Sequence, residues 1–252
     1  MRSLNKVFIP AALSLLTAFP SLAQNDLKLW YDKPAKVWEE ALPLGNAKLG
    51  AMVYGGVEEE HYQLNDNTLW SGFPEDGNNP DGRQYLPKVR AAIFAGDYEK
   101  AAALWKKMQG PYSARYLPMG DLKLDFGQVK STSYYRDLDL SNAIASVKYQ
   151  SEGVRYSRET FVSHPDKVMV IHLTADKQKA LHFKAALSSK LRYKIKKLSS
   201  DHLVLTGKAP KFVANRDYEP EQVVYDDWKG EGKNLEIHLK VRTEGGRSYI
   251  EG

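Results

Sequence analysis

The sequence predicts a mainly β protein, an antiparallel sandwich interrupted by a short helical hairpin. Three observations lead to this fold class. Short runs in which apolar and polar residues alternate recur along the chain, as in "DLKLDF" and "LEIHLKVR". A single segment in the first half changes to helical spacing. The 252 residues include no cysteine, so neither a disulfide framework nor a thiolate metal site holds the fold together.

The first 23 residues are typical of a secretory signal peptide. Arg2 and Lys6 give a positive start, "VFIPAALSLLTAF" is apolar, and Ser21 and Ala23 are small residues at the positions that a signal peptidase reads. The alternative is a buried core helix. The apolar run is too short to span a bilayer. We therefore expect cleavage after Ala23 and a periplasmic or extracellular protein whose domain comprises residues 24–252.

Most of the remaining chain is predicted to form strands. Runs of period two joined by short spacers indicate antiparallel strands with one buried face, and many at close spacing indicate a sandwich. The runs are 121–126, 143–150, 154–163, 167–175, 181–188, 202–207 and 235–242. The segment "KLRYKIKK" at 190–197 makes one strand face basic, which is either a solvated face or a contact for an acidic glycan or the cell envelope.

The helical insert lies within residues 83–110. Val89 and Ile93 fall on one helical face, and after a glycine Asp97 is a plausible N-cap for a second helix. Trp105 continues the apolar spacing of that second helix. The spacing favours a packed core position for Trp105 over a role as a sugar platform.

Composition excludes several classes of function. The formal charge of +5, which falls by two when Arg2 and Lys6 are removed, is too mild to indicate nucleic-acid binding. The six histidines do not pair at metal-ligand spacing, and no nucleotide or acyl-transfer motif is present. We expect no metal, no cofactor and no membrane span. Paired carboxylates cannot be chosen among 31 acidic residues; the run at 58–60 and the pair Asp137 and Asp139 are both predicted to be solvated.

Aromatic residues in polar loops point instead to carbohydrate. A sugar ring has an apolar face of C–H groups that stacks on an aromatic ring, while its hydroxyls need amide, carboxylate or guanidinium partners. The loop aromatics are Trp70, Tyr112, Tyr116, Tyr218, Tyr225 and Trp228. Three of them lie in the long polar loop 215–234, and long loops on β domains often carry function.

Several blocks together resemble the opening of glycoside hydrolase family 95. They are "ALPLGNAKLGAMVYGG", "LNDNTLWSG", "YLPMGDL", "SRETFVSHPD" and "LTGKAP", in that order, and the resemblance runs from about Leu27 to the last residue. Many members have glutamate at the position of Asp66. The resemblance implies an N-terminal antiparallel β-super-sandwich and an inverting enzyme, mostly an α-L-fucosidase, with some relatives acting on α-L-galactosides.

In the family, the catalytic carboxylic acid and the aspartate–asparagine set that activates water lie in an (α/α)₆ barrel that follows this domain. The present sequence ends at Gly252, before any such barrel, so no residue here receives a catalytic role. The resemblance implies substrate-binding roles at the barrel mouth for Asn65, Asn67 and Trp70, with Arg115 and Tyr116 as further candidates. The alternative is that the asparagines cap turns and the aromatic rings pack at a loop base.

The resulting hypothesis is the non-catalytic N-terminal domain of an inverting glycoside hydrolase acting on fucosylated glycans, inactive without its barrel. Its expected partners are fucose-containing glycans and the barrel of the same polypeptide. A free carbohydrate-binding module is one alternative, and a purely structural domain that braces the barrel is another. An exposed apolar patch would favour the bracing role.

Overall fold

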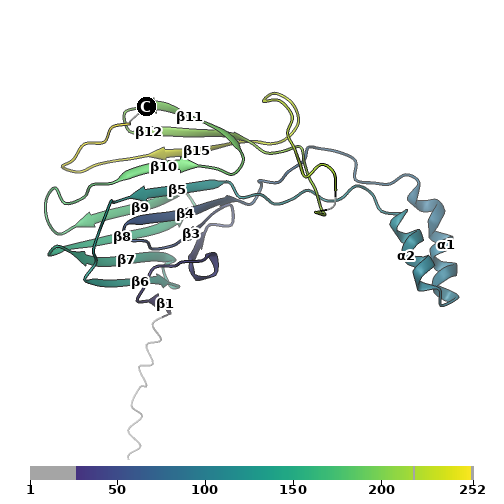
Figure 1. Cartoon of the computed structure of the whole chain (residues 1–252), viewed down its shortest axis with the longest axis horizontal. Coiled ribbons are helices and arrows are strands. Elements are labelled where there is room, and N and C mark those ends of the chain that lie inside the picture. Colours follow the sequence, from purple (N-terminus) through teal and green to yellow (C-terminus); the bar gives the residue numbers. More distant parts are fainter. Residues whose placement is uncertain (1–26, 218, 251–252) are drawn as a thin grey trace, which may run out of the picture.

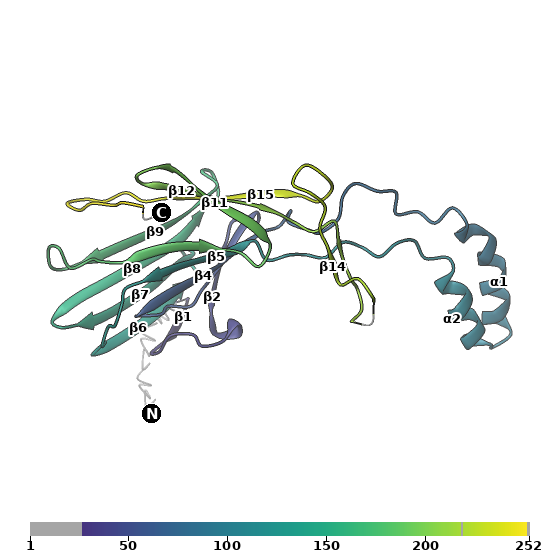
Figure 2. The same ribbon diagram turned by 45° about the horizontal axis from the view of Figure 1, so that its top comes forward.

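The structure, a computed structural model, describes residues 27–217 and 219–250. The predicted signal peptide lies outside these residues. Three antiparallel sheets form the body, with a helical hairpin standing apart from it in both views (Figures 1 and 2). The prediction of a mainly β sandwich with a helical hairpin insert is confirmed. Among the described helices, none combines the length and apolar character needed to cross a bilayer.

Sheet I has the strand order β1-β6-β7-β8-β9. Its strands are β1 (Lys28–Tyr31), β6 (Ser133–Asp139), β7 (Ile144–Ser151), β8 (Val154–Ser163) and β9 (Val168–Ala175). Sheet II has the order β10-β5-β4-β3-β2. Its strands are β10 (Lys184–Ser188), β5 (Gly120–Asp125), β4 (Glu59–Asp66), β3 (Leu49–Val53) and β2 (Leu42–Gly45). A short 3₁₀ helix, η1 (Trp38–Glu40), precedes β2.

Sheet III has the order β11-β12-β15. Its strands are β11 (Arg192–Ser199), β12 (His202–Lys208) and β15 (Asn234–Lys240), and a two-residue ladder joins β13 (Phe212–Val213) to β14 (Val223–Val224). The edge strand β11 is exposed along its whole length, and within the predicted basic segment 190–197 only Leu191 is buried. Burial in sheet III is therefore found in β12, where Leu205 is completely enclosed, and in β15, where Leu235 and Ile237 are buried.

One apolar core joins the three sheets. It contains Leu138 and Ala145 from sheet I, Tyr62 and Leu122 from sheet II, and Leu205 from sheet III. These residues occupy alternate positions along their strands, so the period-two pattern places them on one face. Burial of such side chains contributes roughly 1.5–3 kcal/mol each relative to exposure, which is how a chain without disulfides is held together.

The helical hairpin is inserted between β4 and β5. Helix α1 (Gly82–Phe94) and helix α2 (Tyr98–Lys106) pack against each other, and their buried residues include Val89 and Ala101. The predicted cap is confirmed, because the Asp97 side chain accepts a hydrogen bond from the backbone N–H of Lys100 at 3.1 Å. Extended segments on either side carry the hairpin away from the sheets (Figure 1).

The helical hairpin exposes several large apolar side chains. Phe94 is 87% exposed, Tyr98 70% and Trp105 53%. The prediction that Trp105 packs in a core is therefore wrong. Its helical spacing does place it on an apolar stripe, but within the described residues no sheet or loop covers that stripe.

Two predictions about acidic residues are also wrong. Glu60, expected at a solvated hairpin end, is fully buried and lies 3.2 Å from the guanidinium of Arg158. Asp137, expected on a wet strand face, is only 5% exposed. Its carboxylate accepts a hydrogen bond from the Tyr135 hydroxyl at 3.1 Å and lies 3.6 Å from the Lys28 ammonium. Buried carboxylates are stable only with such partners.

Candidate functional site

At the base of the helical insert, residues 69–71 pair antiparallel with residues 115–117, and this short pairing is called the zipper. Trp70 and Tyr116 form an isolated β-bridge between the segment that leaves the sheets toward the hairpin and the segment that returns from it. The backbone N–H of Ser71 donates to the carbonyl of Arg115 at 2.8 Å, and that of Leu117 donates to Leu69 at 3.1 Å. The Ser71 hydroxyl also accepts from the Arg115 N–H at 2.8 Å. These bonds place the block "LNDNTLWSG" beside "YLPMGDL". The sequence of either block does not indicate that the two are neighbours.

Trp70 and Tyr116 form an exposed aromatic pair at this base. Their ring centroids are 5.2 Å apart with planes inclined at 59°. Trp70 is 41% exposed and Tyr116 45%. The Trp70 indole N–H donates to the carbonyl of Asn67 at 2.9 Å, which fixes the ring orientation. Partial burial, with the nearby Asp66 charge, raises the pKa of the Tyr116 hydroxyl, so this group remains a neutral hydrogen-bond donor.

The two predicted asparagines do different things. The Asn67 amide donates to the carbonyl of Ala47 at 2.8 Å, tying the end of β4 to the turn between β2 and β3. Asn65 points from the outer face of β4 into a cavity of about 100 Å³. Its side-chain oxygen is buried and accepts no hydrogen bond from the described residues. Because an unsatisfied buried acceptor is costly, a donor supplied from outside, such as a sugar hydroxyl, fits this position.

Sequence reasoning missed the other walls of this cavity. They are formed by Trp38, Gln63, Leu64, Pro118, Gly120, Asp121 and Lys190. Asp121 is paired with the His61 ring at 2.7 Å, and Gln63 accepts from the Tyr54 hydroxyl at 3.2 Å. The alternation of β4 could have indicated Gln63 as a neighbour of Asn65 on one face. Trp38 and Lys190 come from distant segments, and no local pattern marks them.

Arg115 lies at the zipper, but its guanidinium is directed onto backbone. It donates to the carbonyl of Asn215 at 2.7 Å and to that of Ala214 at 3.2 and 3.3 Å. The Lys233 ammonium likewise donates to the carbonyl of Thr68 at 2.5 Å. The polar loop 215–234 is thereby fastened to both sides of the insert. Arg115 consequently positions the loop beside the aromatic pair, and a ligand contact from its guanidinium would require one of these bonds to open.

Residues of sheet III also hold the loop 215–234 in place. Lys208 is fully buried at the end of β12, and its ammonium donates to the carbonyl of Gly230 at 2.5 Å. The Lys194 ammonium lies 4.8 Å from the centre of the Trp228 ring. Two of the predicted loop aromatics are thus fixed by cations, since the Arg192 guanidinium lies 4.5 Å from the Tyr225 ring. The loop therefore presents Tyr225 and Trp228 in a defined arrangement, while Tyr218 lies outside the described residues.

The cavity and the aromatic pair together offer what sugar binding requires. Asn65, Asp121 and Lys190 line a small hollow, and the amphipathic rings of Trp70 and Tyr116 form a separate exposed pair in the segments that follow β4 and precede β5. No group of three histidine, aspartate or glutamate side chains suited to holding a metal ion occurs within 27–217 or 219–250. The arrangement is suited to holding and orienting a polyhydroxylated ligand.

Comparison with known proteins identifies the domain. Residues 29–249 match the family model described as "Glycosyl hydrolase family 65, N-terminal domain". The chain belongs to this family. This glycosyl hydrolase N-terminal domain is 32% identical over 235 residues to "Alpha-L-fucosidase 2" of Arabidopsis thaliana, which covers 90% of the chain and 28% of the relative.

Fungal relatives give the same picture. The domain is 34% identical over 177 residues to a "Probable alpha-fucosidase A" of Aspergillus niger, covering 66% of the chain and 22% of the relative. A protein of the same description in Aspergillus oryzae is 30% identical over 171 residues. The chain thus spans well under a third of the length of these curated relatives.

Proposed function

We propose that this chain is the non-catalytic N-terminal domain of an exported, inverting α-L-fucosidase of glycoside hydrolase family 95. The observation that carries the proposal is the match to an N-terminal domain over residues 29–249, combined with similarity to three fucosidases that are several times longer. The sequence blocks resembling family 95 support the finer assignment, and the leader at 1–23 supports export to the periplasm or cell exterior.

Within that enzyme, the domain both braces the catalytic part and helps shape the sugar pocket. The exposed apolar stripe of the hairpin, with Phe94 and Trp105, supports docking against a further part of the polypeptide. Trp70 and Tyr116 support a contribution to the pocket because they pair at the base from which that hairpin extends, and Asn65 supports it through its unsatisfied side-chain oxygen in a small cavity. Asn67 and Arg115 contribute by holding this base in shape.

The proposal is tested by assaying hydrolysis of an aryl α-L-fucoside. The 252-residue chain is compared with a polypeptide extended through the following reading frame. We expect activity only in the extended protein, since the general acid and the water-activating groups lie outside this domain. Comparable activity in the short chain would contradict the proposal. A reading frame that stops directly after Gly252 would also contradict it and favour a free carbohydrate-binding module.

The contribution of the aromatic pair is tested in the extended protein. We expect Trp70→Ala to lower kcat/KM for the aryl fucoside about tenfold, mainly through KM, because a stacking contact stabilises bound substrate and transition state alike. Tyr193→Ala, which removes an exposed aromatic ring from the edge strand β11, serves as the matched control. Equal kinetics for the two variants would show that Trp70 only packs at the loop base.

A further inference from the structure

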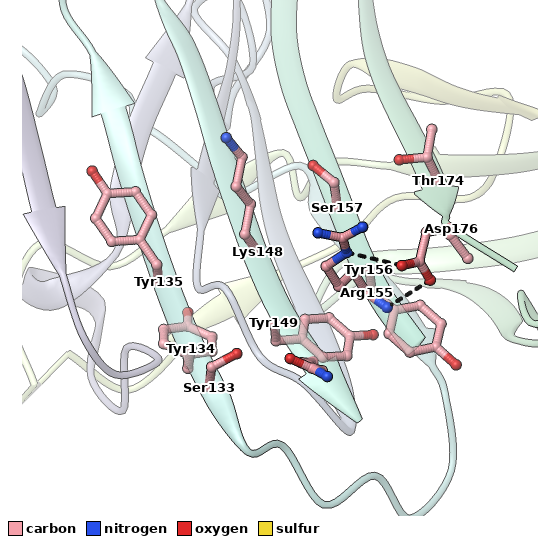
Figure 3. Close-up of a pocket in the computed structure, with 12 residues that line it drawn as sticks. Ser133, Tyr134, Tyr135, Lys148, Tyr149, Arg155, Tyr156, Ser157, Thr174 and Asp176 are labelled. Atoms are coloured by element: carbon pink, nitrogen blue, oxygen red, sulfur yellow. Dashed lines mark hydrogen bonds and ion pairs between the residues drawn. The ribbon is translucent and has the colours of Figure 1, made fainter. Parts of the chain in front are cut away.

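The outer face of sheet I is hollowed over strands β6 to β9. A groove of about 480 Å³ is lined by residues of these four strands, which Figure 3 draws as sticks. Its two sides are rows of cross-strand neighbours. One row is Tyr135, Lys148, Ser157 and Thr174, and the other is Ser133, Gln150, Arg155 and Asp176. The residues between the rows, such as Tyr149, point to the opposite face and pack in the interior.

An aromatic platform stands at one end of this groove. Trp30, on the edge strand β1, is 62% exposed, and its ring lies nearly parallel to that of Tyr135, with centroids 6.4 Å apart. The hydroxyl of Tyr135 donates to the buried carboxylate of Asp137, which also faces the Lys28 ammonium. The platform is therefore fixed from beneath while the indole remains open to solvent.

The charges along the groove largely cancel. Asp176 accepts from both the backbone N–H and the guanidinium Nε of Arg155, each at 2.9 Å. The backbone N–H bond from Arg155 lowers the pKa of Asp176, so this pair stays ionised under ordinary conditions. Asp137 and Lys28 likewise offset each other. Lys148 is the remaining cation of the lining, which disfavours a polyanion as ligand.

The lining also offers unengaged polar groups. In the part of the chain that the structure describes, the side chains of Lys148, Gln150, Ser157 and Thr174 have no hydrogen-bond partner within the protein. They provide ammonium, amide and hydroxyl groups in two parallel rows. At about 4.8 Å between strands, the rows extend for roughly 14 Å.

We propose that this groove binds a neutral oligosaccharide, laid across β6 to β9 with one sugar ring stacked on Trp30 and its hydroxyls bonded to the two polar rows. This surface belongs to sheet I, whereas the cavity of Asn65 belongs to sheet II. It is a second glycan site whose binding does not depend on the proposed fucosidase activity, whereas its role within the enzyme rests on that proposal. Its role is to hold a glycan chain near the enzyme by a part other than the residue being cleaved.

The test is binding of neutral oligosaccharides to the 252-residue chain, measured by NMR titration. The probes are 2′-fucosyllactose, a xyloglucan heptasaccharide and galactohexaose at up to about 10 mM, the range that detects weak single-site affinities. Hexagalacturonate is the polyanionic comparison. We expect at least one neutral probe to bind with a Kd of about 1 mM or tighter and to shift resonances of β6 to β9.

Variants then locate the site. We expect Trp30→Ala to weaken binding at least tenfold and Lys148→Met to weaken it several-fold, while Trp105→Ala on the hairpin leaves it unchanged. Trp30 and Lys148 are exposed, so both variants keep the fold, which a thermal melt verifies. Absence of binding by every neutral probe would overturn the proposal. So would binding that survives Trp30→Ala but is lost in Trp70→Ala, because the glycan would then occupy the base of the hairpin.

Discussion

Replacing Arg158 by methionine is expected to cost about 3–5 kcal/mol of the free energy of unfolding, the usual effect of breaking a buried ion pair. Arg158 is 2% exposed on β8, and its guanidinium faces the fully buried carboxylate of Glu60 at 3.2 Å. It also donates to the carbonyl of Gly56 and lies over the Phe126 ring, 5.1 Å from its centre. Without it, Glu60 is an uncompensated charge inside the sandwich.

Chemical denaturation of the purified chain measures this effect. Arg155→Met is the matched control, because Arg155 is in the same strand, is 79% exposed in its side chain and pairs with an exposed-face carboxylate. Its loss should cost well under about 1 kcal/mol, as for other surface ion pairs. Adding Glu60→Gln to Arg158→Met should recover much of the loss. A single-variant cost no larger than the control would contradict the role of the pair.

The same pair gives the Arg158→Met variant a defined pH dependence. Burial raises the pKa of Glu60, and the Arg158 guanidinium is the largest influence opposing that rise. Removing Arg158 therefore raises this pKa further. A raised folded-state pKa means that the folded state holds the proton more tightly, so the contribution of Glu60 to the variant's stability is fully present below the unfolded-state pKa of about 4.3 and is lost as pH rises. Its deficit relative to the parent chain should be smaller at pH 5 than at pH 8.

Substituting Gly56 by alanine should also be severely destabilising, by about 3 kcal/mol or enough to prevent folding. A methyl group at Gly56 would overlap the backbone carbonyl of Glu59, and backbone cannot move aside as a flexible side chain can. The neighbouring Gly55 has a φ of 76°, and its N–H donates to Glu60 at 2.7 Å. The tight turn at Gly55 and Gly56 is thus built around the buried carboxylate.

Gly77→Ala provides the comparison for this turn. Gly77 lies in the segment leading to the hairpin, where an added methyl group meets no atom within 4 Å. Its stability should stay within about 0.5 kcal/mol of the parent chain. The measurement is again the denaturation midpoint, and similar midpoints for Gly56→Ala and Gly77→Ala would show that the turn can relax. Because the two substitutions add the same methyl group, their difference isolates the local geometry.

The strands of the sandwich could be predicted because the sequence carries their period directly. The run at 154–163 corresponds to β8 and the run at 202–207 to most of β12. Asp97 could likewise be recognised as a cap, since its hydrogen bond to Lys100 is local. What local patterns do not contain is the pairing order of strands, so the division into sheets I, II and III emerged only in the structure.

The burial errors have separate physical reasons. For Glu60 the sequence did indicate burial. Tyr62 and Leu64 mark the buried face of β4, and Glu60 lies at an alternate position on that same face. The prediction gave more weight to the charge of three consecutive glutamates than to this alternation. Asp137 is on the outward parity of β6 and is buried by Lys28 and Trp30 of β1, a strand about 100 residues away in sequence. Such long-range cover leaves no local trace.

The sequence predicted where the candidate site lies better than it predicted what each of its side chains binds. Trp70, Arg115 and Tyr116 do meet at the root of the insert, whereas Asn65 lines a cavity that none of them lines. The substrate-binding roles of all four remain a prediction. That Arg115 directs its guanidinium onto the carbonyls of Ala214 and Asn215 depends on a contact across 99 and 100 residues. Sequence could identify which residue types gather there but not which of them bind each other.

The zipper at the base of the hairpin also determines which changes in the length of the insert between β4 and β5 the fold tolerates. β4 and β5 are direct neighbours in sheet II although the whole insert separates them in sequence. The zipper at Trp70 and Tyr116 closes that loop before the helices begin, so the register of the sheet is fixed independently of what lies beyond. Closing a longer flexible loop costs only about 0.6 kcal/mol for each doubling of its length. The hairpin is consequently a graft point, where a longer, shorter or unrelated segment can be exchanged while the sandwich folds as before.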